Sequence, residues 1–287
     1  MPEWKKYKNG CYETICNNMN EVIDIYNITS SCEYYLYRGH SKIKEYKLIS
    51  SIDREISKYA IENDKITQEH LRRVLLNFIL EDFTIKLKKY YDKIDFESNE
   101  QIWALGQHYG LKTPYLDWSK DFFIAAFFSS VDNTNHDGCI YILNTKLINE
   151  INNKIKLQGP DINYSELRII NKPDIFNSRQ SMQKGCFTLT PSGISVDSWI
   201  NTFKEYKAKP VLQRIVIPKN LKNKVINYLY GADTDYSKIY PDIQGICMSS
   251  NLFIPYAIKN FYGFKKNREA QELLRKEMRK DRELRDK

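Results

Sequence analysis

Residues 121–131, with the sequence DFFIAAFFSSV, are apolar on every side when they are wound into a helix. Ser119 or Asp121 can accept the first backbone N–H groups of this helix and so cap it. A helix without a polar face is fully buried, so the chain must build a sizeable core around it. With 287 residues, 42% of them hydrophobic and 28% charged, the chain is long enough to do so in one large domain without disulfides.

Periodicity in the sequence indicates further elements on both sides of this helix. We expect strands at 34–37, 139–143, 185–189 and 212–217, an extended piece at 113–119, and helices at 64–91, 100–110, 196–207 and 219–230. Strands that arrive after helices, rather than strictly between them, indicate an α+β fold. The expected architecture is a single domain with a small mixed sheet surrounded by helices and a charged helix at the C-terminus.

The two ends of the chain differ from this central part. We expect residues 1–29 to form an N-terminal helical segment, residues 30–255 the domain, and residues 256–287 a charged helical tail. From Lys265 to Lys287 there are ten Lys/Arg and six Asp/Glu, a surplus of four that is half of the net charge of +8. The tail is either a solvated terminal helix or a contact for a polyanion or a partner protein.

Several classes of protein are disfavoured by what the sequence lacks. The six cysteines form no CxxC pair, and the histidines have no HxxxH spacing, so we expect reduced thiols and no metal. P-loop, GxGxxG and GxSxG motifs do not occur. Neither an apolar leader nor a stretch long enough to cross a bilayer is visible, so the expected location is the cytoplasm, with no membrane partner.

Arg38 is the first candidate functional residue. It follows the apolar and aromatic run Tyr34–Tyr37 and precedes Gly39, so its guanidinium emerges at the end of a buried strand where a ligand can approach the backbone. A guanidinium offers a rigid fork of donors for phosphate or carboxylate. The alternative is an arginine that pairs with a carboxylate of the protein itself.

A second polar group stands at the end of the helix at 100–110. Gln107, His108 and Tyr109 come directly before Gly110, and Asp117 follows a few residues later. Imidazole and carboxylate together can do acid–base work or hold the hydroxyls of a ribose. The alternative is an inward-facing helix end in which His108 and Asp117 satisfy each other.

The segment before the strand at 185–189 is the third candidate. Arg179, Gln180, Gln183 and Lys184 supply two cations and two amides, and Thr188 lies within the strand. These polar groups are suited to the edge of a cleft.

Taken in order, these motifs resemble those of the FRG domain family over roughly residues 30 to 250. The matching residues are Tyr37-Arg38-Gly39, Gln107-His108-Tyr109-Gly110-Leu111 with Thr113 and Leu116-Asp117-Trp118-Ser119, Ala125-Ala126 with Phe128, Arg179-Gln180 with Gln183, Gly185 and Phe187-Thr188, and Tyr240-Pro241-Asp242-Ile243-Gln244-Gly245. The chain has Tyr37 where the family name has Phe, and Tyr115 where Leu is usual.

The first of these motifs is similar to the opening strand motif of arginine-type ADP-ribosyltransferases. The resemblance implies an ADP-ribosyltransferase-like fold with NAD as substrate and no metal. Arg38 would hold the NAD phosphates, and Tyr109 or Trp118 would stack on the nicotinamide ring. Gln183 stands where such enzymes normally have a glutamate, so the carboxylate that stabilises the ribose would be Asp117 or Asp242. The implied catalytic residues are Arg38, His108, Asp117, Gln183 and Asp242, and the implied NAD-binding residues are Tyr37, Arg38, Gly39, Gln107, Tyr109, Thr113, Trp118, Arg179 and Thr188.

Three functions remain open at this point. The first is an ADP-ribosyltransferase-like effector of bacteria or phage, a toxin or anti-phage defence protein that modifies RNA, DNA or protein and can have a cognate antitoxin. The second is a metal-independent nuclease that uses His108 and Asp117 as an acid–base pair with Arg38 on the scissile phosphate. The third is a non-catalytic module that binds a nucleotide or a partner.

Overall fold

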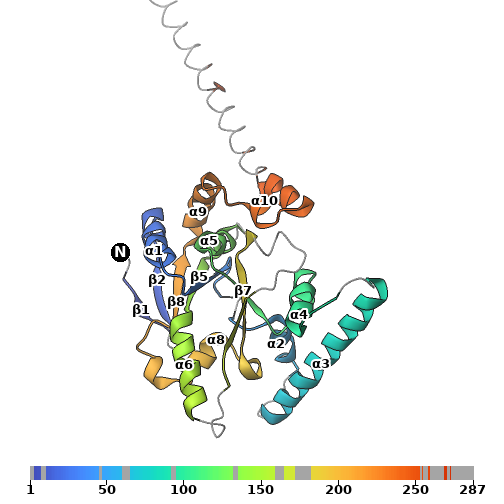
Figure 1. The fold of residues 1–287 in the computed structure, drawn as a ribbon. Helices are drawn as coiled ribbons and strands as arrows, with labels where there is room; N and C mark the ends of the chain where they lie inside the picture. Colours follow the sequence, from blue (N-terminus) through green and yellow to red (C-terminus); the bar gives the residue numbers. More distant parts are fainter. Residues whose placement is uncertain are drawn as a thin grey trace, which may run out of the picture. The chain divides into compact units, whose positions relative to one another are not determined.

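The computed structural model describes residues 3–7, 11–44, 47–59, 65–91, 95–131, 135–158, 165–171 and 182–252, with positions 254, 258, 268, 269 and 272 beyond them. The chain divides into two compact units, Met1–Thr234 and Asp235–Lys287. In the first unit, strands and helices build a mixed α/β structure around one sheet (Figure 1). The second unit contains α10 (Tyr236–Ile239) and a helix at 243–252, and it is described by itself. Most of the expected charged tail lies outside the described residues.

The sheet of the first unit has eight described strands in the order β1-β2-β8-β5-β3-β4-β7-β6. The strands are β1 (Lys5–Lys6), β2 (Tyr12–Ile15), β3 (Tyr35–His40), β4 (Leu116–Ser119), β5 (Gly138–Asn144), β6 (Arg168–Asn171), β7 (Gly185–Leu189) and β8 (Leu212–Ile217). Only β2 and β8 pair in parallel among them, so the sheet is mixed as expected. It is larger than the expected small sheet because β1, β2 and β6 add to the strands that periodicity indicated.

The helices of the first unit are α1 (Met19–Ser30), α2 (Ser51–Ile56), α3 (Lys65–Tyr90), α4 (Asn99–His108), α5 (Phe122–Ser130), α6 (Thr145–Gln158), α8 (Val196–Asn201) and α9 (Lys219–Gly231). The expected helices α3, α4, α5 and α9 are confirmed to within a few residues. The single helix expected at 196–207 is instead α8 followed by the short 3-10 turn η3 (Lys204–Tyr206). Among the described helices, none combines the length and the apolarity that a bilayer crossing requires.

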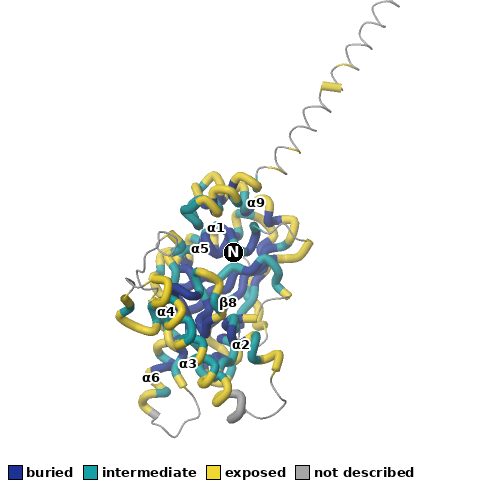
Figure 2. Tube along the Cα trace, turned by 90° about the vertical axis from the view of Figure 1, so that its right-hand side faces the viewer, coloured by how far each residue is buried: buried dark blue, intermediate teal, exposed yellow. Residues whose placement is uncertain are grey.

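Side-chain alternation divides the sheet into two packed faces. On one face, β3 and β5 lie against α5, and α5 lies against α9. On the other face, strand residues such as Leu36, Trp118 and Leu212 form a core cluster with residues of α6 and α8, including Ile148 and Trp199. Figure 2 shows the buried residues along the strands and the helices that cover them.

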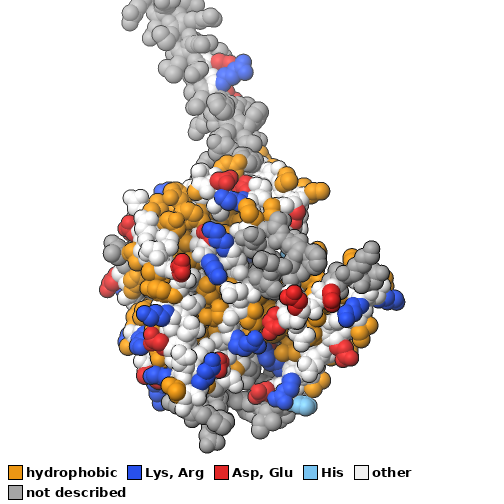
Figure 3. Space-filling view, viewed as in Figure 1, with side chains coloured by type: hydrophobic (Ala, Val, Ile, Leu, Met, Phe, Trp, Pro, Cys, Tyr) orange, Lys and Arg blue, Asp and Glu red, His pale blue; other side chains and the backbone are white. Residues whose placement is uncertain are grey.

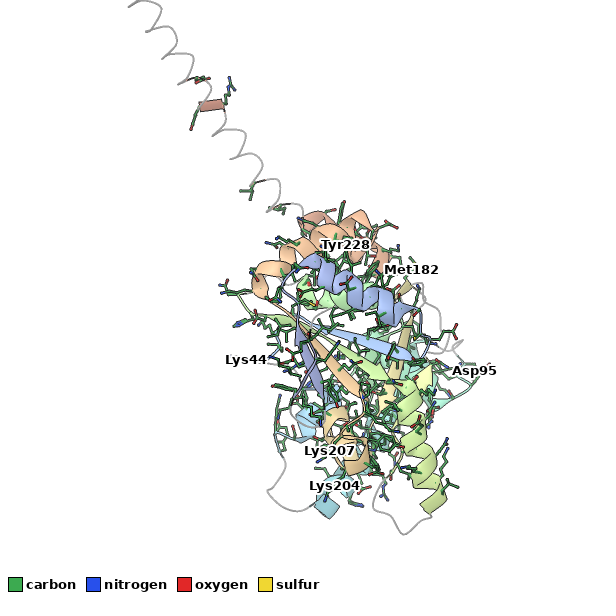
Figure 4. The ribbon with its side chains drawn as sticks, turned by 90° about the vertical axis from the view of Figure 1, so that its left-hand side faces the viewer. Lys44, Asp95, Met182, Lys204, Lys207 and Tyr228 are labelled. Atoms are coloured by element: carbon green, nitrogen blue, oxygen red, sulfur yellow. The ribbon has the colours of Figure 1, made fainter. Side chains whose placement is uncertain are left out.

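The apolar helix α5 is enclosed much as its sequence requires. Asp121 caps it, with Oδ1 accepting the Phe123 N–H at 2.9 Å. Seven of its nine residues are buried, while Phe123 and Phe128 are half-buried. Phe123 completes its packing with rings from two neighbouring helices, stacking on Tyr26 of α1 at 4.3 Å and meeting Tyr228 of α9 edge-on at 5.9 Å; Tyr228 is labelled in Figure 4.

The N-terminal segment is helical only in its second half. Helix α1 covers Met19–Ser30, but Tyr12–Ile15 forms β2 instead, pairing in parallel with β8. Helical spacing of the apolar residues suggested a helix from the start of the chain. The strand forms because β8 offers an open edge whose backbone groups need partners, and this pairing is a long-range contact that local periodicity does not contain.

Gly39 sets the distance between β3 and α5. A Cβ atom at this position would overlap the carbonyl oxygen of Ala125 and lie 2.7 Å from the backbone nitrogen of Ser129. Both are backbone atoms of α5, so they cannot move aside as a flexible side chain could. The glycine of the Tyr-Arg-Gly motif is therefore required by close helix–strand packing.

We expect Gly39→Ala to lower the free energy of unfolding by about 1–3 kcal/mol, because α5 must move away from β3. Gly231→Ala is the matched control, since an added Cβ meets nothing within 4 Å there. That control should stay within about 0.5 kcal/mol of the parent chain. Urea unfolding followed by circular dichroism measures both variants, and equal stability of the two would contradict the packing argument.

Candidate functional site

Arg38 lies on β3 with its guanidinium held by two neutral acceptors. Its Nη1 donates to the backbone oxygen of Asp117 at 2.6 Å, and its Nε donates to Nε2 of His40 at 3.2 Å. The strand continues two residues beyond Arg38, to His40, so the arginine lies within the strand rather than at its end. The two bonds fix the plane of the guanidinium while its positive charge is left without a carboxylate among its described hydrogen-bond partners.

Burial and neighbouring cations shape the electrostatics of this group. Burial lowers the pKa of Arg38, and the charge of Asp117 opposes that change while Arg54 of α2 adds to it. Burial, followed by the charges of Arg38 and Arg54, holds the pKa of His40 well below its usual value of 6.5. His40 is therefore neutral near neutral pH, and its Nε2 can accept the Arg38 hydrogen bond. The result is a cationic site that contains a neutral imidazole.

A row of polar residues crosses the sheet at the level of Arg38. Glu13, Arg214, Tyr141 and Arg38 stand directly opposite one another on β2, β8, β5 and β3. Arg214 is neutralised, because its Nε and Nη2 both donate to Oε2 of Glu13, the first at 2.6 Å. The ring of Tyr7 covers its guanidinium at 3.8 Å. Of the two arginines in this row, Arg214 has a carboxylate partner, whereas the described hydrogen bonds of Arg38 end on neutral acceptors.

A chain of hydrogen bonds joins the second motif to the Arg38 site. Nε2 of Gln107 donates to Oδ2 of Asp117 at 2.5 Å, and Oγ1 of Thr113 donates to Oε1 of Gln107. The backbone N–H of Thr113 donates to Oγ of Ser51 at 3.0 Å. Gln107 thus orients the carboxylate of Asp117, whose charge acts on Arg38, and Thr113 orients Gln107. The structure brings these four sequence-predicted residues into one connected network.

The end of α4 carries the two aromatic members of this motif. His108 is the last residue of α4, and its ring meets that of Tyr109 edge-on at 4.7 Å. The helix ends there because Gly110 adopts a φ of +92°, which favours glycine. Tyr109 is 75% exposed, so its ring is available to stack on a ligand.

Four of the expected NAD-binding residues are buried: Thr113 of the network above, and Tyr37, Trp118 and Thr188. Trp118 is 3% exposed, and its Nε1 donates to Oγ1 of buried Thr188 at 2.9 Å. Tyr37 packs edge-on against Phe122 of α5, and burial raises its pKa to about 12. Packing explains why these residues occur in the motifs. Of Tyr109 and Trp118, the two residues expected to stack on the nicotinamide ring, Tyr109 is the exposed one.

The remaining candidate residues are Gln183, Asp242, Arg179 and Gln180. Gln183 follows Met182, which is labelled in Figure 4, in the turn before β7, and its backbone oxygen accepts from Oγ of Ser119 at 2.8 Å. Asp242 belongs to the second unit, where Oδ1 accepts the Gly245 N–H at 2.9 Å. Arg179 and Gln180 lie outside the described residues.

Sequence reasoning missed several members of the site. His40 had a signal, because it stands two residues after Arg38 on a strand and so shares its face. Arg214 also had one, as the only charged residue of the apolar strand Leu212–Ile217. Arg54 had none, since nothing in the chain around α2 indicates that this helix lies near β3. Across the described residues, no group of three His, Cys, Asp or Glu is arranged to hold a metal ion.

Comparison with known families gives a match over part of the chain. Residues 33–138 match the FRG domain. This match supports the FRG family, and it spans β3, α4, β4 and α5, which carry Arg38, Gln107, Thr113 and Asp117. No curated protein and no solved structure gave a match.

The buried histidine His40 gives a test of the site's electrostatics. Because the pKa of His40 is lowered in the folded state, the unfolded chain binds a proton first as the pH falls below 6.5. The free energy of unfolding should then fall by up to about 1.4 kcal/mol per pH unit from this residue. His40→Gln keeps an acceptor for Arg38 and should lose this part of the dependence.

Urea unfolding at pH 7, 6 and 5 measures the slope of stability against pH. His70→Gln changes an exposed histidine of α3 and should keep the slope of the parent chain. If His40→Gln shows the same slope as His70→Gln, His40 is not held neutral by its surroundings.

Proposed function

We propose that this protein is an NAD-dependent ADP-ribosyltransferase-like effector in which Arg38 binds the pyrophosphate of NAD. The observation that carries the proposal is the hydrogen bonding of Arg38, whose described bonds end on His40 and the Asp117 backbone oxygen rather than on a carboxylate. A partly buried guanidinium beside a second arginine, Arg54, favours a doubly charged anion. The resemblance of the Tyr-Arg-Gly motif to that of arginine-type transferases supports NAD as that anion.

The chemistry would take place at the ribose carbon that bears nicotinamide. The bond from this carbon to the ring nitrogen breaks, its electron pair stays with nicotinamide, and the acceptor's nucleophile forms a new bond to the same carbon. Positive charge develops on the ribose as the bond breaks. The Asp117 carboxylate, oriented by Gln107 at 2.5 Å, would bond the ribose hydroxyls and take the acceptor's proton.

Other residues would complete the site. Tyr109 is exposed at the end of α4 and supplies a face for the nicotinamide ring. RNA, DNA and protein are the proposed acceptor classes, because a net charge of +8 favours an acidic partner without selecting one. As a toxin or anti-phage defence protein, such an effector can be held in check by a cognate antitoxin.

Arg38→Ala should lower turnover of NAD about 100-fold or more, because the pyrophosphate loses its charged ligand. Arg38→Lys should also be impaired, since an ammonium lacks the planar fork that His40 and Asp117 hold in place. Purified protein is incubated with labelled NAD and, separately, total RNA, DNA or cell lysate, and label in the acceptor is counted.

Arg73→Ala, an exposed arginine of α3, is the control and should keep full turnover. Circular dichroism checks that each variant is folded. Unchanged turnover in folded Arg38→Ala would contradict the proposal. Shortened RNA or DNA without transferred label would instead favour the nuclease that uses His108 and Asp117.

Asp117→Asn should separate chemistry from binding. The amide oxygen can still accept from Gln107, and the backbone oxygen still accepts from Arg38, so affinity for NAD should change less than about threefold. Turnover should fall about 100-fold, because the charge that stabilises the ribose is gone. Calorimetric titration with NAD and the labelling assay measure the two quantities. An active Asp117→Asn variant would exclude Asp117 as this carboxylate, and a parent chain that binds NAD without turnover would favour a binding module.

A further inference from the structure

A pocket of about 450 Å³ lies beneath α3, and none of its lining residues is Arg38, Gln107, Thr113 or Asp117. Its walls come from α3, α4, the loop before β4, and the ends of β6 and β7. This volume is within the range of small-molecule sites, about 300–1,000 Å³. The pocket is therefore large enough for a ligand of its own.

The loose packing of α3 accounts for the pocket. None of the described side chains of this helix, residues 69–90, is fully buried, although the helix is 26 residues long. Leu76 and Leu80 pack against the cluster that contains Trp103 and Tyr115. An ion pair from Arg72 to buried Asp53 at 2.7 Å joins α3 to α2. Between these contacts, α3 leaves space above the rings.

The floor of the pocket is aromatic. Trp103 and Tyr115 both line it, and Tyr115 stacks on Phe187 with ring centroids 5.0 Å apart. The amides of Asn77 and Asn99 stand on the wall. A flat ring with hydrogen-bonding substituents matches this combination of apolar floor and polar wall.

The charges around the pocket disfavour an anion. Three glutamates and two arginines line it, and both arginines are already paired within the protein. Arg72 donates from Nε and Nη2 to Asp53, and Arg168 donates from Nη2 to Glu100 at 3.2 Å. Glu69 and Glu166 add two more carboxylates to the lining; of the two, Glu166 forms an ion pair at 3.3 Å with Lys156, which lies outside it. Figure 3 shows acidic and basic side chains gathered over α3 and the elements beside it.

We infer that this pocket binds a small organic cation with a flat aromatic body. The rings of Trp103 and Tyr115 contact the body and attract the positive charge. The three lining carboxylates add negative charge around it, although Glu100 and Glu166 also have partners within the protein. The site is separate from the Arg38 site and selects the opposite charge.

Tryptamine and indole-3-acetate test this inference, because they share one ring and carry opposite charges. Calorimetric titration of the full chain should show one saturable site for tryptamine, with indole-3-acetate bound about tenfold more weakly or not at all. Replacing Glu69 and Glu166 together by Gln should reduce the ratio of the two affinities several-fold. Absence of saturable tryptamine binding, or equal affinity for the two compounds, would overturn the inference.

The location of the site is tested by filling it. Asn77→Trp adds an indole at the pocket wall and should weaken tryptamine binding about tenfold, while Arg73→Trp, on the same helix outside the lining, should leave it unchanged. Both positions are exposed, so both variants should fold. Saturating tryptamine should also slow hydrogen exchange in α3. Equal binding by the two variants would place the site elsewhere, and none of these readouts depends on turnover of NAD.

Discussion

The contact between Gly39 and the backbone of α5 is the constraint on which the rest of the site depends. It brings a helix without a polar face directly onto β3, so the residues of β3 that alternate with Gly39 must point to the opposite face of the sheet. Arg38 and His40 are those residues. The packing that buries α5 thereby determines the face of the sheet on which the Arg38 guanidinium lies. In the Tyr-Arg-Gly motif, Gly39 allows the close approach of α5, and Arg38, the residue before it, points to the opposite face.

Two arginines, Arg38 and Arg214, lie on the same face of the sheet, but their charges have different partners. Arg214 receives a carboxylate from the neighbouring strand β2 and a ring from Tyr7, so its charge is satisfied within the protein. Arg38 receives a backbone oxygen and a neutral imidazole. Burying a charge is costly unless it is compensated, and the described hydrogen bonds of Arg38 supply no carboxylate for that purpose. This difference is the reason for proposing Arg38, rather than Arg214, as the ligand-binding arginine.

Local pattern was sufficient for much of the fold and for part of the site. The helix α5 was predictable from its continuous apolar run and its cap, and the strands β7 and β8 from their own short apolar runs. The strand β2 was not, since it depends on the free edge of β8, more than 190 residues away in the chain. Trp118 shows the same limit in the site. Its place in the motif suggested a ligand contact, but alternation along β4 directs its side chain into the core. Arg54 reaches the site only through the tertiary position of α2.

The network from Thr113 to Asp117 links packing to chemistry. Thr113 is hydrogen-bonded to Ser51 of α2 on one side and to Gln107 on the other, and Gln107 orients the carboxylate of Asp117. Pro114 and Tyr115, which lie between Thr113 and Asp117, line the pocket beneath α3. One five-residue segment therefore borders both the cationic site and the aromatic pocket. Its residues must make contacts with both sites at once, and this requirement explains why the segment is densely hydrogen-bonded.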